Sequence, residues 1–175
     1  MAQILISEVG EAAAREIMPD ANRFNSLNRR DKAEYIRKVI KRMKQMIGIP
    51  KTYSILVSCG QKCCSANTRH KALEIFGNSR SLAEFIDRIN EHKLGGGRLK
   101  LKDKNTITGG YDRCYCSMVR HASTPFKDTT YCQCSTGWYK QLFETALGRP
   151  VKVTLLQSII AGAKTCEFEI KIDTK

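Results

Sequence analysis

Apolar residues recur at helical spacing in the first part of the chain. One stripe has members at i, i+3, i+4, i+7 and i+11, and basic residues occupy much of the remaining surface; the stripe comprises Ile36, Val39, Ile40, Met43 and Ile47. The pattern predicts two helices over residues 7–50. Asp31, followed by an acidic residue three positions later, marks the start of the second helix, with Asn28 as an alternative cap. Gly48 and Pro50 are expected to end it.

The middle of the chain is less regular. Residues 53–59 form a short apolar run that fits either helix or strand. Two short helices are predicted over 67–76 and 81–90, separated by a turn. Three consecutive glycines at 95–97 favour neither a helix nor a strand interior, so a turn is expected there.

The second half of the chain alternates apolar and polar residues over short segments, as strands do. We expect strands at 98–101, 106–108, 113–119, 129–134, 151–156 and 166–172. A helix is expected between Ser135 or Thr136 and Gly148. The pattern predicts a single α+β domain over 1–175, with a helical part (1–50) and a Cys-rich α+β part (51–175) whose antiparallel sheet is covered by helices.

Length and hydropathy define the class of protein. The chain has 175 residues, 42% of them hydrophobic, which is enough for one sizeable core. Its start lacks the basic and apolar segments of a secretory signal, and no run of about 18 apolar residues could cross a bilayer. A cytoplasmic protein with no membrane partner is expected.

The charge is strongly positive. Thirty Lys and Arg against 17 Asp and Glu give a net charge of +13, which attracts polyanions. No nucleic-acid-binding motif accompanies these residues, so solvated lysines on helix faces are the preferred interpretation and nucleic-acid binding ranks lowest.

Eight cysteines are the most informative feature. In a reducing compartment they indicate metal binding or thiol chemistry rather than disulfides. Two Cys-x-Cys pairs on adjacent strands would each present two sulfurs on one face, where a tetrahedral zinc or, alternatively, an iron–sulfur cluster could bind. The candidate ligands are Cys59, Cys63, Cys114, Cys116, Cys132 and Cys134.

Thiol catalysis is the competing chemistry. A nucleophilic cysteine needs a lowered pKa, which a helix N-terminus or a nearby cation supplies. Cys64 precedes a predicted helix and lies near Arg69 and His70, and Cys134 precedes the helix expected at Ser135. Both are therefore candidate nucleophiles.

The C-terminal part of the chain resembles a known family. The segments 131–138, 148–153 and 158–162 and the ending Cys166-x-Phe168 are similar to the closing module of 4-vinyl-reductase-type and thiazoline-carboxylate hydrolase-like domains. The resemblance implies a fold like that of the TRAPP components, a pocket for a small organic ligand and, in some relatives, zinc. It places metal ligands at Cys134, Ser158 and Cys166, although serine is a poor zinc ligand.

Two functions follow as hypotheses. The first is a zinc-binding module that binds or senses a small organic molecule. The second is a cysteine- or metal-dependent hydrolase of a small heterocycle or amide. The sequence is also compatible with a homodimer.

Overall fold

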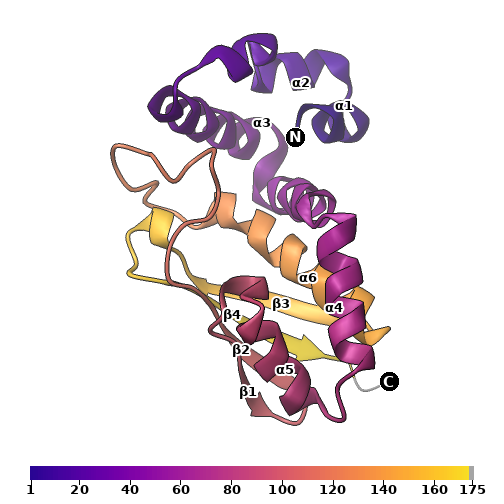
Figure 1. Ribbon diagram of the computed structural model, residues 1–175. Coiled ribbons are helices and arrows are strands. Elements are labelled where there is room, and N and C mark those ends of the chain that lie inside the picture. Colours follow the sequence, from indigo (N-terminus) through magenta and orange to yellow (C-terminus); the bar gives the residue numbers. More distant parts are fainter. Residues whose placement is uncertain (174–175) are drawn as a thin grey trace.

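The computed structural model describes residues 1–173, and within them it has six α-helices and one four-stranded antiparallel sheet (Figure 1). The helices are α1 (Ala2–Val9), α2 (Glu11–Ile17), α3 (Arg29–Cys63), α4 (Ala66–Gly77), α5 (Leu82–Glu91) and α6 (Gln133–Leu147). The strands are β1 (Lys100–Asp103), β2 (Thr106–Tyr111), β3 (Val151–Gln157) and β4 (Cys166–Ile172). The α+β prediction is confirmed.

Helix α3 bends sharply in the middle. Gly48 has φ 75° and ψ 165°, outside the helical region, and Pro50 begins the second half. The Asn28 side chain accepts a hydrogen bond from the backbone N–H of Asp31 at 2.9 Å, so Asn28 is the cap. The helix was expected to end at Gly48 and Pro50; instead Gly48 kinks it and α3 continues to Cys63, so the ambiguous run 53–59 is its second half.

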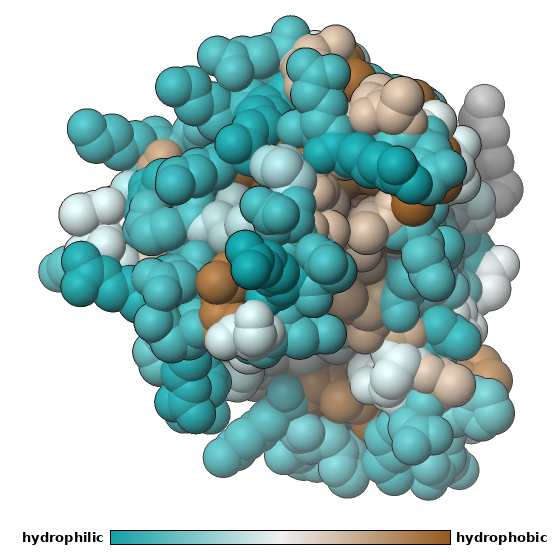
Figure 2. All heavy atoms as spheres, turned by 90° about the horizontal axis from the view of Figure 1, so that it is seen from above, coloured by the Kyte–Doolittle hydropathy of each residue, from teal (hydrophilic) through white to brown (hydrophobic). Residues whose placement is uncertain are grey.

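Both halves of α3 contribute to a core shared with α1 and α2, and the second half has α6 as a further neighbour. In the first half, the predicted stripe packs against α1 and α2, with Ile36, Val39, Ile40 and Met43 buried. Figure 2 looks down on this end of the molecule, where hydrophilic side chains cover most of the surface. The second half packs against α6. None of the helices within residues 1–173 is long and apolar enough to cross a bilayer.

The sheet has one face toward the helices. Its strand order is β1-β2-β4-β3. In β4, Phe168 and Ile170 are fully buried in a core that includes side chains of α4, α5 and α6. Glu169 alternates with them and forms ion pairs with Lys102 and Lys171 on the other face. The closing strands predicted at 151–156 and 166–172 are thus confirmed. The strands predicted at 98–101 and 106–108 are also confirmed, with ends shifted to 100–103 and 106–111.

Two predicted strands are wrong. Residues 113–119 form no strand; a turn replaces it, in which the N–H groups of Val119 and Arg120 donate to the carbonyl of Cys116. Residues 129–134 form a short 3₁₀ turn that continues into α6, which starts at Gln133 rather than at Ser135. Asp128 accepts from the Thr130 N–H at 2.9 Å and fixes this turn.

Glycines allow α3 and α6 to cross at very short range. A Cβ at Gly60 would lie 1.7 Å from the carbonyl oxygen of Cys134, and a Cβ at Gly137 would lie 1.9 Å from the carbonyl oxygen of Val57. Both contacts are with backbone atoms, which a rotamer change cannot move. The two helices therefore approach as closely as their backbones permit.

Replacement of Gly60 by Ala should lower the free energy of unfolding by about 3 kcal/mol, the upper end of the usual cost of overpacking. The reason is that the added methyl group can be accommodated only if α3 and α6 separate. Chemical denaturation measures the change.

Gly77→Ala is the matched control, because Gly77 is also helical and an added Cβ meets nothing within 4 Å. This variant should be neutral or more stable by up to about 1 kcal/mol. Equal stability of the two variants would contradict the proposed close crossing.

Candidate functional site

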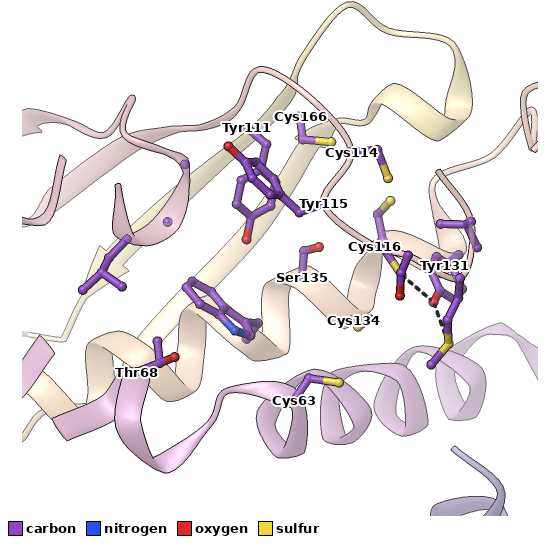
Figure 3. A pocket seen from close by; sticks show the side chains of 18 of the residues that line it. Cys63, Thr68, Tyr111, Cys114, Tyr115, Cys116, Tyr131, Cys134, Ser135 and Cys166 are labelled. Carbon is purple, nitrogen blue, oxygen red and sulfur yellow. Dashed lines mark hydrogen bonds between the residues drawn. The ribbon is translucent and has the colours of Figure 1, made fainter. Parts of the chain in front are cut away.

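A pocket of about 450 Å³ lies beside the crossing of α3 and α6 (Figure 3). Six of the eight cysteines line it: Cys63, Cys114, Cys116, Cys132, Cys134 and Cys166. They come from the end of α3, the segment after β2, the start of α6 and the start of β4. The clustered cysteines, which were expected to come together, do lie around one cavity, but they are not on paired strands.

Figure 3 shows how these thiols are divided around the cavity. Cys63 and Cys134 belong to α3 and α6 and lie on one side. Cys114 and Cys166 lie toward the other side, where the segment after β2 passes the start of β4. Cys116 lies near Tyr131, and its sulfur is 3.1 Å from the phenolic oxygen.

Cys63 has the chemistry of a thiolate. Its side chain is exposed, and a hydrogen bond from Cys134 lowers its pKa to about 6. The same bond, together with burial, strongly raises the pKa of Cys134, which stays protonated and donates. Of the two sulfurs, that of Cys63 therefore loses its proton more readily.

Burial raises the pKa of each of the other pocket thiols for which a pKa shift is resolved, so these thiols are protonated at neutral pH. Burial raises the pKa of Cys132 to about 12 and that of Cys114 to about 11. Burial also raises the pKa of Cys166, whose sulfur accepts a hydrogen bond from the backbone N–H of Ile159 at 3.3 Å. Cys166 thus combines the core position expected from the sequence with a place in the pocket wall.

Two cysteines from the sequence analysis lie outside the pocket lining. Cys59 is buried in the core formed with α1 and α2. Cys64 is fully buried in the other core, and burial raises its pKa to about 11. A buried, protonated thiol is a poor nucleophile, so these features favour Cys63 over Cys64.

Metal binding was the main expectation for these residues. Within residues 1–173, no group of three or more His, Cys, Asp or Glu side chains is arranged to hold a metal ion. Ser158, which the family resemblance places at a ligand position, has a buried hydroxyl oxygen without a hydrogen-bond partner in the described part of the chain. Zinc and an iron–sulfur cluster stay predictions.

Aromatic side chains complete the pocket. Tyr111, Tyr115 and Trp138 line it, and Tyr139 supports them from the core. The rings of Tyr111 and Tyr139 stack with centroids 5.4 Å apart, and the Tyr139 hydroxyl donates to the carbonyl of Gly95 at 2.7 Å. The sequence analysis did not identify Tyr111 or Tyr115 as site residues, since nothing in their spacing marks them.

The fold and this site define an α+β protein with a thiol-lined, partly aromatic pocket. The profile of a family of unknown function, DUF6144, matches residues 2–175, and the chain belongs to this family. No curated protein matches the sequence. The resemblance to 4-vinyl-reductase-type and thiazoline-carboxylate hydrolase-like domains stays a prediction.

Cys134→Ala should raise the pKa of Cys63 from about 6 toward its ordinary value of 9.0, because the hydrogen bond that stabilises the thiolate is lost. The pH dependence of Cys63 alkylation by iodoacetamide, followed by mass spectrometry, gives this pKa. The pH midpoint of alkylation is the quantity to compare, rather than the rate at pH 7. A thiolate of higher pKa is also a stronger nucleophile, so the alkylation rate at pH 7 falls by less than the fraction of thiolate does.

Cys134→Ser provides the control. Its hydroxyl can still donate to the Cys63 sulfur, so the midpoint should stay well below that of Cys134→Ala. Equal pH midpoints of Cys63 alkylation in Cys134→Ala and in the unmodified protein would contradict the role of Cys134 in lowering the pKa of Cys63.

Proposed function

We propose that the protein binds a small, largely apolar organic molecule in the cysteine-lined pocket and captures it covalently through Cys63. The observation that carries the proposal is the position of Cys63, whose pKa is lowered beside Cys134, in the wall of a pocket that also contains aromatic side chains. Ligand pockets of this size are typically apolar with a few polar groups that fix orientation.

The chemistry is that of an activated cysteine. The electron pair of the Cys63 sulfur forms a bond to an electrophilic carbon of the ligand, and the leaving group departs with the electrons of the broken bond. The Cys134 thiol, which lowers the pKa of Cys63, is a proton donor beside the reacting sulfur. No oxidant or reductant is required.

A binding or sensing role is preferred to a cysteine-dependent hydrolase. Hydrolysis of a covalent adduct needs a group that activates water, most often a histidine. None of the residues that line the pocket is a histidine. His121 lines a neighbouring cavity instead.

The proposal is tested with two electrophiles that differ only in an aromatic group. N-benzyl-2-chloroacetamide should alkylate Cys63 about fivefold faster than 2-chloroacetamide, because a ring bound against Trp138 gains about 1 kcal/mol. Sulfur forms a bond to the methylene carbon, and chloride leaves. Site-resolved mass spectrometry at neutral pH measures both rates.

Trp138→Ala should abolish the preference for the aromatic reagent, whereas Trp138→Phe should keep most of it. Cys63→Ser should remove the rapid labelling altogether. Equal rates for the two reagents in the unmodified protein would refute a ligand pocket for apolar molecules.

The zinc prediction has its own test. Elemental analysis of the purified chain measures bound metal directly, and a chelator added before alkylation reports whether a metal protects the thiols. A rise in Cys63 alkylation after chelation would replace covalent capture with metal binding as the function of this pocket.

A further inference from the structure

A second cavity, of about 580 Å³, lies beside the cysteine pocket. It is formed by the segment that follows β2 and by the connection between β3 and β4. Cys114 and Tyr115 line both cavities, so the two spaces share a wall. The covalent chemistry of Cys63 uses none of the charged residues around this second cavity.

The lining of this cavity is positively charged. Arg113, Arg120 and Lys164 face a single carboxylate, that of Asp112. Within residues 1–173, none of these three cations forms a salt bridge. Cations gathered in a concave site without carboxylate partners concentrate anions there.

The two arginines are held in place by their neighbours. The backbone N–H of Arg120 donates to the Cys116 carbonyl at 3.0 Å, in a turn anchored by the buried side chain of Val119. The Arg120 Nε donates to Nε2 of His121 at 3.1 Å, which leaves both Nη groups as donors. The Arg113 guanidinium lies over the ring of Tyr115, 4.9 Å from its centroid.

Lys164 is presented by an ordered turn. Ile159–Ala161 form a short 3₁₀ helix, and the N–H groups of Ala161 and Ala163 both donate to the Ser158 carbonyl at 3.1 Å. These bonds fix the backbone that leads to Lys164. Lys164 therefore reaches the cavity from the connection between β3 and β4, whereas the two arginines belong to the segment after β2.

We infer that this second cavity, with Arg113, Arg120 and Lys164 around it, is a binding site for a phosphate group. A phosphate monoester carries a charge near −2 and three acceptor oxygens at neutral pH, which match two arginine forks and an ammonium group better than a carboxylate does. Because Cys114 and Tyr115 line both cavities, the organic part of a phosphorylated ligand would lie against these two residues; this placement alone rests on the proposed function.

Isothermal titration of the full chain with inorganic phosphate at constant ionic strength tests the site. Arg120→Ala and Arg113→Ala should each weaken phosphate binding about tenfold or more, because each removes charge-assisted hydrogen bonds. Arg120→Lys should lose less, since it keeps the charge. Thermal denaturation checks that the variants are folded.

Arg149→Ala is the matched control, because Arg149 is exposed in the turn after α6, outside both cavities. It changes the net charge equally and should leave phosphate affinity unchanged. Equal losses in Arg149→Ala and Arg120→Ala would overturn the site in favour of general charge attraction. Acetate that binds as tightly as phosphate would overturn the phosphate assignment.

The two proposals fail separately. Cys63→Ser should bind phosphate normally, since Cys63 does not line the second cavity. Loss of the aromatic preference in alkylation with phosphate binding intact would refute only the proposed function. Absence of phosphate binding with rapid Cys63 labelling intact would refute only the phosphate site.

Discussion

The close crossing of α3 and α6 is the contact on which the site depends. Gly60 and Gly137 remove the side chains that would separate the two backbones. Cys63 lies three residues after Gly60, and Cys134 lies three residues before Gly137, so each thiol is about one helical turn from the contact. The close approach of the backbones therefore brings Cys63 and Cys134 to the same side of the pocket, where Cys134 lowers the pKa of Cys63.

This arrangement also explains why the cysteines differ chemically although they surround one cavity. Desolvation favours the neutral thiol, and it dominates at Cys114, Cys132 and Cys166. Cys63 is exposed and accepts a hydrogen bond, so the charged form is favoured there. The cavity wall thus combines aromatic rings and thiols of raised pKa with one thiol, Cys63, whose pKa is lowered, a contrast that suits a weakly polar ligand with one reactive carbon.

The sequence predicted most of the scaffold and only part of the site. Helical periodicity identified the stripe on α3, and Gly48 and Gly148 marked the break and the end of two helices, because these signals are local. The alternation at 113–119 failed, since turn hydrogen bonds to Cys116 compete with strand pairing. Five of the six candidate metal ligands, all except Cys59, line one cavity, and the metal itself stays a prediction. Cysteine clustering could not single out Cys63, whose pKa depends on a helix from a distant part of the chain.

The position of the pocket follows from the way the chain divides its apolar side chains. Cys132 belongs to the core around α1 and the first half of α3, whereas Cys166 belongs to the core around α6 and the sheet. The pocket is lined from both cores and thus lies at their boundary. Close packing within each core leaves little free volume. At this boundary a cavity and a readily ionised thiol carry the lowest cost in folding free energy. Water reaches one side of the pocket, and the contact at Gly60 fixes the position of the other side.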